Sequence, residues 1–396
     1  MGTQSLTTIQ PRAGHNGQHG FAPTFPTLWP HMLVSRPRPQ ELPFPLGEPG
    51  ARFFTLARFG IHELATQLRL CGRELLFPAY FQGVELEALT SAGVRLRLFP
   101  VHEGMRVDPD EVASLIGPAT AGVYMIHYGG FPGPVRELAE VCRRHGVVLI
   151  EDCALALLSC LGDQPLGSFG DAGVFCLYKT IPLPDGGAVV LRDGWRSEPA
   201  ALRSPSRLSV GARAGSSLLL NLRMRDVFAA GLVRKGVLAL RQAAPRSAAD
   251  PVDRRAHFDA AGLGVRMSDL SHRLLRHQNF GDIVVRRREN YAFLHQQLGD
   301  ILPPVLGMLP DGVCPLFYPF LVRNRSQVLE ALRARGVEIG EFWPDRNPSV
   351  PAGAFPEVDR LRETALWLPC HQDLTPKALE QLAVQVREVV TETRAA

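Results

Sequence analysis

Apolar and polar positions alternate in two different rhythms between residues 53 and 190. Short runs of consecutive apolar residues are separated by longer stretches in which apolar residues recur every three or four positions. The first rhythm is typical of buried strands, and the second of amphipathic helices. The strands predicted in this way cover residues 74–77, 94–99, 122–127, 147–150, 173–177 and 188–191. Helices are predicted over residues 58–70, 84–92 and 134–145, and a further one begins at Asp108. This alternation predicts an α/β fold whose mostly parallel sheet is covered by helices.

Residues with special backbone preferences mark the ends of these elements. Pro78 ends the strand over 74–77, and Gly93 and Gly146 follow the ends of two helices. Asp108 precedes a proline and two acidic residues, a pattern typical of a helix N-cap.

The alternation stops after Asp193. Residues 196–257 are rich in arginine, alanine and leucine, and they contain helical stretches such as 226–241. One long helix or a pair of helices is predicted over 267–298. A smaller α/β unit follows, with a strand predicted over 315–322 and helices predicted over 326–335 and 376–390.

These patterns divide the chain into three predicted parts. A flexible N-terminal segment covers 1–45, because its first 30 or so residues are rich in glycine, proline, threonine, glutamine and histidine and lack the features of a signal peptide. A large domain covers 46–260, with 196–257 as a helical insertion. An interface helix and a small C-terminal domain cover 261–396.

The composition is that of a folded globular protein, with 45% hydrophobic and 21% charged residues. No apolar run approaches the length of a membrane span, so we expect no membrane partner. The net charge is +4, but the arginines are scattered and no basic run is interleaved with aromatic residues, which argues against nucleic acid. The arginine run 286–288 is interpreted as a solvent-exposed helix face. Seven cysteines without a CxxC pair indicate reduced, buried thiols in a cytoplasmic protein rather than disulfides or a zinc site.

Lysine is almost absent from the chain. Only Lys179, Lys235 and Lys377 are lysines among 43 basic residues. Lys179 follows the apolar strand predicted over 173–177. An arginine stays protonated and cannot condense with an aldehyde, whereas a desolvated lysine amine can lose its proton and form a Schiff base. Lys179 is therefore a candidate nucleophile, although a lysine at a strand end can also extend into solvent without a chemical role.

An acidic pair stands at the end of another predicted strand. Glu151 and Asp152 follow residues 147–150, and the carboxyl ends of parallel strands form the edge of a sheet where ligands bind. A carboxylate there can keep a pyridine nitrogen protonated, or it can simply cap the next helix. The acid is followed in the chain by Lys179 and then by a glycine-rich turn at 185–187. This order suits a pyridoxal phosphate enzyme, in which an acid faces the ring nitrogen and a lysine carries the aldehyde.

Eight short stretches occur in the same order as in one known family. They are FPAYFQGVELEAL (77–89), VDPDEV (107–112), IHYGGFPGP (126–134), HGVVLIEDCALA (145–156), GSFGDAGVFCLYK (167–179), DGGAVV (185–190), GVRMSDL (264–270) and LWLPCHQDLT (366–375). They resemble the DegT/DnrJ/EryC1/StrS sugar aminotransferases, which are fold-type I pyridoxal phosphate enzymes. The resemblance implies a large domain with a mostly parallel central sheet, a smaller C-terminal α/β domain, pyridoxal 5′-phosphate as the cofactor, and a homodimer.

The resemblance also implies roles around the reacting end and the phosphate of the cofactor. Lys179 would carry the cofactor as a Schiff base and then move a proton, and Asp152 would pair with the ring nitrogen. Arg58 and Phe59, at the start of a helix, would lie beside the phosphate. Cys176 occupies the place of a serine that usually binds this phosphate.

Further roles concern the ring and the subunit interface. Tyr80 and Phe81 would supply an aromatic ring that stacks on the cofactor, and His127 would line the floor of the pocket. The segment around Gly264 and Arg266 would reach across a dimer interface into the site of the partner.

The chain also departs from the family pattern. A Gly-Thr pair is usual where residues 58–59 stand, an Asn where Gly264 stands, and a polar residue near the cofactor hydroxyl where Leu155 stands. The loop that carries the lysine is shorter than usual. Without a contraction Ile181 would take the lysine position, and with one Lys179 takes it. We favour the contraction, because the glycine-rich turn then follows at nearly the expected distance.

We predict an aminotransferase that takes an amino group from a donor such as glutamate and passes it to a keto group on a nucleotide-linked sugar or cyclitol. The alternative is a divergent protein of the same fold, either dehydratase-like or a non-catalytic scaffold. The dehydratase branch typically has histidine in place of the lysine, so Lys179 argues against it, while the changes at Leu155 and Gly264 leave the scaffold open. A nicotinamide-dependent oxidoreductase is set aside because no GxGxxG follows the first strand.

Overall fold

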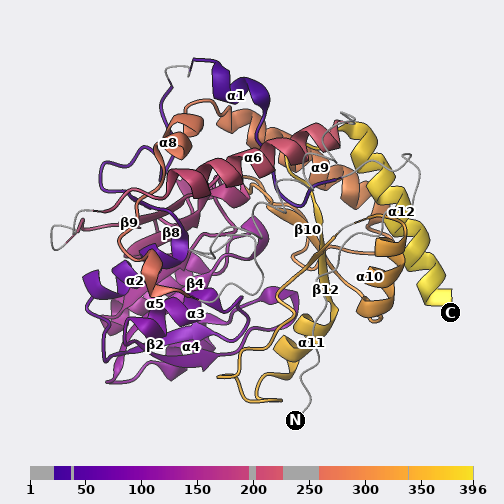
Figure 1. Cartoon of the computed structure of the whole chain (residues 1–396). Coiled ribbons are helices and arrows are strands. Elements are labelled where there is room, and N and C mark those ends of the chain that lie inside the picture. Colours follow the sequence, from indigo (N-terminus) through magenta and orange to yellow (C-terminus); the bar gives the residue numbers. More distant parts are fainter. Residues whose placement is uncertain (1–21, 37–39, 196–201, 226–257, 338, 396) are drawn as a thin grey trace, which may run out of the picture.

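A central sheet of seven strands forms the larger of two domains in the computed structural model (Figure 1). In order across the sheet, the strands are β1 (Arg52–Phe54), β9 (Gly187–Leu191), β8 (Ala172–Cys176), β5 (Val148–Asp152), β4 (Thr120–Ile126), β2 (Glu74–Pro78) and β3 (Arg95–Phe99). Neighbouring strands from β8 to β3 are parallel, and β9 is antiparallel to both of its neighbours. The mostly parallel sheet predicted from the sequence is therefore confirmed. The structure describes residues 22–36, 40–195, 202–225, 258–337 and 339–395.

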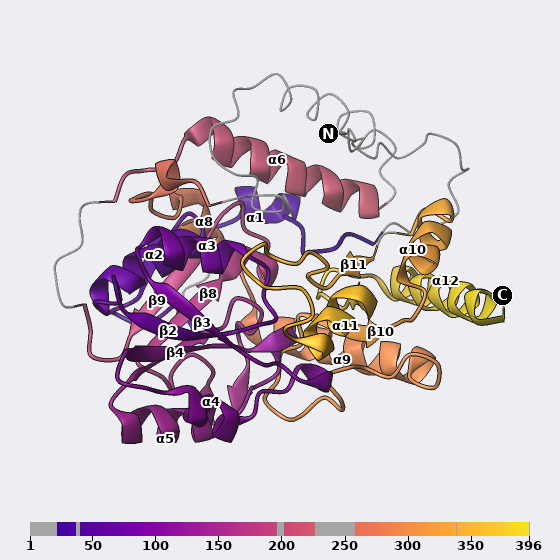
Figure 2. The same ribbon diagram turned by 90° about the horizontal axis from the view of Figure 1, so that it is seen from below.

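Helices cover both faces of this sheet. α2 (Ala57–Gln67) and α3 (Val84–Ser91) pack on one face, while α4 (Pro109–Leu115) and α5 (Val135–His145) pack on the other (Figure 2). The strands β4, β5 and β8 are consequently buried along almost their whole length. This double cover explains why these strands read as continuous apolar runs.

The helix ends follow the signals in the sequence. The Asp108 side chain accepts a hydrogen bond from the backbone N–H of Asp110 and so caps α4, whose first residue is Pro109. Gly146 ends α5 with a φ of 64°, a left-handed conformation that glycine adopts without a steric penalty.

A second, smaller sheet has three antiparallel strands, β10 (Phe317–Leu321), β12 (Ala365–Pro369) and β11 (Gly340–Glu341), with β12 in the middle. α9 (Phe280–Leu298), α10 (Arg325–Ala334) and α12 (Pro376–Ala395) pack together around it, and α11 (Pro356–Thr364) leads into β12. The smaller C-terminal α/β unit is thus present as predicted, beside the large domain (Figure 1). A short hairpin of β6 (Cys160–Leu161) and β7 (Gln164–Pro165) precedes β8.

The segment predicted as a long helix or a helix pair over 267–298 is a pair. α8 (Asp269–Leu275) ends before Asn279, whose side chain caps α9 by accepting from the backbone N–H of Asp282. α8 belongs to the large hydrophobic core, to which it contributes Leu274 and Leu275. The division of the chain at residue 261 stays a prediction.

The N-terminal residues 22–36 differ from the flexible segment predicted over 1–45, because they are tied to the rest of the chain. The backbone N–H of Thr27 donates to Oδ2 of Asp373 at 2.7 Å, and the indole N–H of Trp29 donates to Oδ1 at 3.0 Å. The N–H of Leu28 donates to Ser217 on α6 (Arg207–Met224). α1 (Pro30–Val34) follows this anchor. The buried carboxylate of Asp373 therefore holds this segment in place by accepting two hydrogen bonds from it. No local sequence pattern indicates such a contact.

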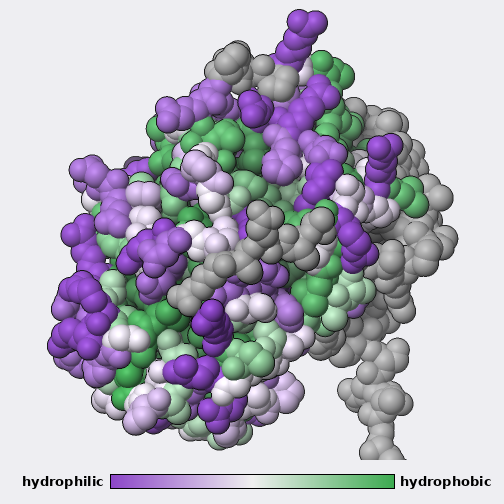
Figure 3. Space-filling model, turned by 90° about the vertical axis from the view of Figure 1, so that its left-hand side faces the viewer, coloured by the Kyte–Doolittle hydropathy of each residue, from purple (hydrophilic) through white to green (hydrophobic). Residues whose placement is uncertain are grey.

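α6 is the described part of the predicted helical insertion, and it runs along one side of both domains (Figures 1 and 2). The helical stretch predicted over 226–241 lies outside the described residues. Figure 3 shows the side on which β9 and α2 lie, where hydrophilic residues form most of the outline and hydrophobic ones lie between them. Among the described residues, no helix combines the length and the apolar character that a membrane crossing requires.

Candidate active site

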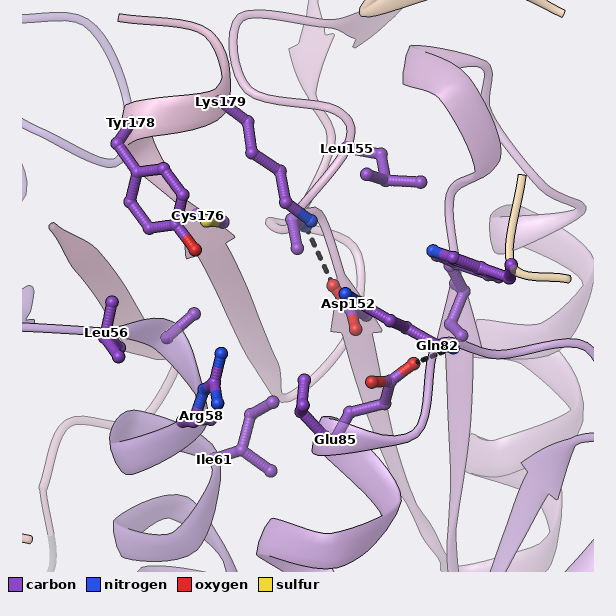
Figure 4. Close-up of a pocket in the computed structure, with 15 residues that line it drawn as sticks. Leu56, Arg58, Ile61, Gln82, Glu85, Asp152, Leu155, Cys176, Tyr178 and Lys179 are labelled. Carbon is purple, nitrogen blue, oxygen red and sulfur yellow. Dashed lines mark hydrogen bonds between the residues drawn. The ribbon is translucent and has the colours of Figure 1, made fainter. Parts of the chain in front are cut away.

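A cavity opens at the edge of the large sheet where the parallel strands end. β4 ends at Ile126, β5 at Asp152 and β8 at Cys176, and all three residues line it. The cavity holds about 590 Å³ of space outside protein atoms, the open solvent at its mouth included. Its lining, shown in Figure 4, consists of Leu56, Ala57, Arg58, Ile61, Gln82, Val84, Glu85, Ile126, Asp152, Ala154, Leu155, Cys176, Tyr178, Lys179 and Trp343. This is the position in which open parallel sheets bind their ligands.

Lys179 and Asp152 face each other across this cavity. Asp152 is the last residue of β5, and Lys179 closes a short 3-10 turn (Leu177–Lys179) that follows β8. Because β5 and β8 are adjacent and parallel, the residues after their carboxyl ends lie at the same sheet edge. The Lys179 side chain points toward Asp152 (Figure 4). The structure thus brings together the two residues that the sequence singled out first.

The carboxylate of Asp152 is buried and held at both oxygens. The phenol of Tyr124 donates to Oδ2 at 2.7 Å, and the backbone N–H of Ala154 donates to Oδ1 at 2.8 Å. Burial raises the pKa of Asp152, while these two hydrogen bonds and the charge of Lys179 lower it in part. Both oxygens keep a further lone pair, so the carboxylate can accept from a ligand in the cavity.

The loop that carries Lys179 is fastened by a buried arginine. The Arg287 guanidinium is 0% exposed and donates to the carbonyl oxygens of Thr180 (3.2 Å), Pro315 (3.2 Å) and Leu316 (3.1 Å). The Gln372 amide also donates to Thr180 O, at 3.1 Å. The interpretation of 286–288 as a solvent-exposed helix face is therefore wrong for Arg287. Carbonyl groups from separate segments compensate for the burial of its charge.

Positive charge and the first turn of a helix lie together at another end of the cavity. Arg58 is 6% exposed and lies in the first turn of α2, whose N-cap, Leu56, has no side chain to cap the helix. The first N–H groups of a helix and its dipole favour an anion. Arg58 lies close enough to Cys176 and Tyr178 to lower the pKa of both groups, although burial, the larger effect, raises them. This end of the cavity can hold a phosphate.

Glu85, Gln82 and Trp343 also line the cavity and were not among the site residues predicted from the sequence. Glu85 is buried on α3 and accepts from the backbone N–H groups of Gln82 at 2.8 Å and Gly83 at 3.2 Å. Burial raises the pKa of Glu85, and the negative charge of Asp152 raises it further. Gln82 is exposed at the cavity rim, and Trp343 reaches the lining from the segment after β11. Pocket lining and core packing were equal alternatives for Trp343 in the sequence, and the structure places it in the lining.

Trp343 has an unusual backbone conformation, with a φ of 45° at a residue that is not glycine. The guanidinium of Arg362 donates to the carbonyl oxygen of Trp343 at 2.9 Å and to that of Ala79 at 3.2 Å. Arg362 therefore ties the Trp343 loop of the small domain to the segment after β2. The position of the Trp343 loop, which shapes this side of the cavity, therefore depends on a contact between the two domains.

The aromatic residues predicted to contact the cofactor lie behind the cavity lining. Tyr80 is 0% exposed, and its phenol donates to the carbonyl oxygen of Phe342. Phe81 packs edge-on against Phe77, with ring centroids 5.3 Å apart. Phe59 packs against Phe258, at 5.9 Å. The stacking and phosphate roles predicted for these three residues stay predictions.

The two residues predicted at a subunit interface also lie outside the lining. Gly264 has a φ of 67°, and no heavy atom lies within 4 Å of the position that a Cβ would take there. Arg266 pairs with Asp269 and donates to the Ser204 hydroxyl at 3.0 Å. Both positions leave the predicted contact with a second subunit untested.

His127 belongs to a buried cluster beside the cavity. Its Nε2 lies 3.0 Å from Glu151 Oε2, and its Nδ1 accepts from the N–H of Gly133 at 3.1 Å. Glu151 also accepts three backbone N–H groups, from Gly167, Phe169 and Gly170. These bonds occupy the donor atoms that, with Cys153, lie close enough together to suggest a metal site. The cluster therefore fastens the loop before β8 to the end of β5.

Known proteins resemble this chain over most of its length. The sequence profile of the DegT/DnrJ/EryC1/StrS aminotransferase family matches residues 92–387. The dTDP-4-dehydro-2,3,6-trideoxy-D-glucose 4-aminotransferase of Saccharopolyspora spinosa is 25% identical over 81% of this chain and 78% of its own length. The UDP-N-acetyl-3-dehydro-alpha-D-glucosamine 3-aminotransferase of Acidithiobacillus ferrooxidans is 34% identical over 81% of this chain and 78% of its own length.

Solved structures share the fold. The crystal structure of the aminotransferase TlmJ from Streptoalloteichus hindustanus superposes with a TM-score of 0.63, covers 87% of each chain and is 23% identical. The fold, the cavity at the strand ends and a family match that spans most of the chain agree with one another. We conclude that the protein belongs to the DegT/DnrJ/EryC1/StrS aminotransferase family.

Proposed function

We propose that this protein is a pyridoxal phosphate-dependent aminotransferase that moves an amino group from an amino acid to a keto group on a nucleotide-linked sugar. The observation that carries the proposal is that the Lys179 side chain points toward the buried Asp152 carboxylate within one cavity (Figure 4). Lysine is scarce in this chain, and its placement at this point supports a chemical role.

The residues of the cavity fit pyridoxal phosphate in three respects. Lys179 offers an amine to the aldehyde, and Asp152 offers a carboxylate to the ring nitrogen. Arg58 and the first N–H groups of α2 offer a cation and donors to the phosphate. Leu155 also lines the cavity, so the polar group that the family usually places near the cofactor hydroxyl is absent from that position.

The side chains have distinct tasks in such a reaction. When bound, pyridoxal phosphate would supply an aldehyde for the amino group and a ring that takes up electrons. Asp152 would hold a proton on the ring nitrogen through its negative charge. Lys179, once its amine is free, would accept at Nζ a proton from the carbon that bears the amino group. It would return this proton to the carbon on the other side of the amino nitrogen, and so act as a general base and then as a general acid. Arg58 would fix the phosphate, so that the reacting atoms stay within reach of Lys179.

The acceptor class is inferred from the relatives and from the rim of the cavity. Both relatives described above are named for keto sugars linked to a nucleoside diphosphate. Exposed Gln82 and half-buried Trp343 lie where a sugar would enter, and an indole face and an amide suit a sugar ring with hydroxyl groups. The homodimer and the cytoplasmic location stay predictions, which the mass in solution and cell fractionation would test.

The direct test traps the cofactor on its lysine. We expect purified protein mixed with pyridoxal phosphate to gain a visible absorbance band, and borohydride to fix the cofactor onto Lys179, located by mass spectrometry of peptides. Lys179→Arg should lose the adduct and the transfer of an amino group from glutamate to dTDP- or UDP-linked keto sugars. If the protein instead transfers the amino group to a cyclitol ketone, the proposed acceptor class is wrong but the assignment as an aminotransferase stands.

Lys377→Arg is the matched control, because Lys377 is exposed on α12, outside the cavity lining. It should keep both the adduct and the activity. An adduct on Lys377, or none in the unaltered protein, would contradict the proposal and favour a non-catalytic scaffold.

A further inference from the structure

Tyr124 contacts the acid of the candidate active site from behind the cavity wall. It lies on β4, is 0% exposed, and does not line the cavity. Its phenol oxygen lies 2.7 Å from Oδ2 of Asp152. In the register of the sheet Ile126 is opposite Asp152, and Tyr124 lies two residues before Ile126, on the same face of β4. The strand pairing itself therefore aims the phenol at the carboxylate.

The direction of this hydrogen bond is fixed. Burial raises the pKa of the Tyr124 phenol well above its usual value, and the neighbouring charge of Asp152 adds to the effect. The phenol therefore keeps its proton and donates it to the Asp152 carboxylate, which when ionised can only accept. A donor stabilises a carboxylate, which accepts, more than a protonated carboxyl group. Tyr124 thus opposes the tendency of burial to neutralise Asp152.

The phenol is also held rigidly. The Tyr124 ring packs on Phe77 of β2 with centroids 4.9 Å apart, and Phe77 packs against Phe81 at 5.3 Å. With Ala154 N–H on Oδ1 and Tyr124 on Oδ2, the carboxylate has donors on both oxygens. Its remaining lone pairs are directed by these two bonds.

We propose that Tyr124 is the positioning residue that keeps Asp152 ionised and oriented toward a cationic ring nitrogen in the cavity. This inference rests on the proposed function, because the ring nitrogen is that of pyridoxal phosphate. A protonated carboxyl group cannot provide the negative charge that holds a proton on that nitrogen. The phenol acts through Asp152 and does not itself touch the ligand.

The test removes only the phenol oxygen, with Tyr124→Phe, and titrates two ligands by absorbance or fluorescence. One ligand is pyridoxal phosphate, and the other is an analogue in which carbon replaces the ring nitrogen. Loss of a hydrogen bond to a charged group should weaken binding of pyridoxal phosphate about ten- to a hundredfold. The analogue has no ring nitrogen to pair with Asp152, so it should bind the variant and the unaltered protein equally.

Tyr318→Phe is the matched control, because it removes another buried phenol oxygen, one that donates to Leu302 O at 2.8 Å in the small domain. It should change the affinity for neither ligand. Circular dichroism checks that both variants fold. If Tyr124→Phe weakens both ligands equally, or neither, the inference is overturned while the proposed function stands. If the unaltered protein does not bind pyridoxal phosphate, the proposed function itself fails.

Discussion

Arg58 is the residue that we propose to hold the phosphate at one end of the cavity. It is buried in the first turn of α2 and stands where the family usually has part of a Gly-Thr pair. Arg58→Met should weaken pyridoxal phosphate binding about ten- to a hundredfold, because charge-assisted hydrogen bonds contribute ~1.5–3 kcal/mol. Arg58→Lys should recover part of the loss, since it keeps the charge without the planar fork. Titration of each variant with pyridoxal phosphate gives the comparison.

Pyridoxal without its phosphate provides the control for Arg58. It should bind Arg58→Met and the unaltered protein alike, because the missing guanidinium has no phosphate to meet. Equal weakening of both compounds would show that Arg58 supports the fold of the cavity rather than the phosphate.

At the residue scale, the positions of the two candidate residues Lys179 and Asp152 were easier to predict than those of the residues that support them. Lys179 and Asp152 could be predicted because each follows a recognisable parallel strand, and adjacent strand ends meet in space. Tyr124 could not be predicted as a site residue, because a tyrosine within an apolar strand is typical of the hydrophobic core. Arg287 was misjudged because helical spacing does not show that carbonyl groups from distant segments surround one position.

The contact between β9 and α2 shapes the cavity at the scale of elements. A Cβ at Gly187, the first residue of β9, would stand 2.2 Å from the backbone nitrogen of Ala57 and 2.4 Å from its Cα. Backbone atoms cannot rotate aside, so Gly187→Ala should push the start of α2 away from the sheet. We expect a cost of about 1–3 kcal/mol in the free energy of unfolding, seen as a lower Tm, together with weaker binding of pyridoxal phosphate.

Gly211→Ala on α6 is the matched substitution. No heavy atom lies within 4 Å of a Cβ at Gly211, and alanine favours a helix more than glycine does. This variant should keep or raise the Tm and leave the affinity unchanged. An unaltered Tm and an unaltered affinity in Gly187→Ala would contradict the prediction, because α2 would then move aside at no cost in stability or in binding.

Elements with a long, regular pattern were predicted well, and those that depend on distant contacts were not. The strands that end at the cavity and the helices between them agree with the sequence pattern. The three-residue β1 was missed, because its pairing with β9 brings together positions more than 130 residues apart along the chain. Residues 22–36 read as a loose tail, because neither Asp373 nor α6 is near them in the sequence.

At the scale of the whole molecule, contacts between the two domains hold them together, and His102 makes one of these contacts. This histidine follows β3 in the large domain, and its Nε2 lies 2.7 Å from Glu111 on α4. Its Nδ1 lies 2.9 Å from Glu357 on α11, beside the small sheet. The two glutamates raise the pKa of His102 above its ordinary value of 6.5. The protonated ring therefore links α4 to α11, the helix that also carries Arg362. Arg362 in turn holds the Trp343 loop.

The raised pKa of His102 gives a pH-dependent contribution to stability, whose sign follows from linkage. A group with a higher pKa in the folded state contributes fully below its unfolded pKa, and the contribution is lost as the pH rises through the folded pKa. His102→Gln should therefore lower the Tm at pH 6, where partly exposed pairs of this kind contribute on the order of 1 kcal/mol, and lower it less at pH 9. His145→Gln, at the exposed end of α5, should not show this difference. Thermal unfolding of the three proteins at both pH values is the measurement that decides. If His102→Gln lowers the Tm at pH 9 as much as at pH 6, or more, the neutral ring joins the domains through its hydrogen bonds alone.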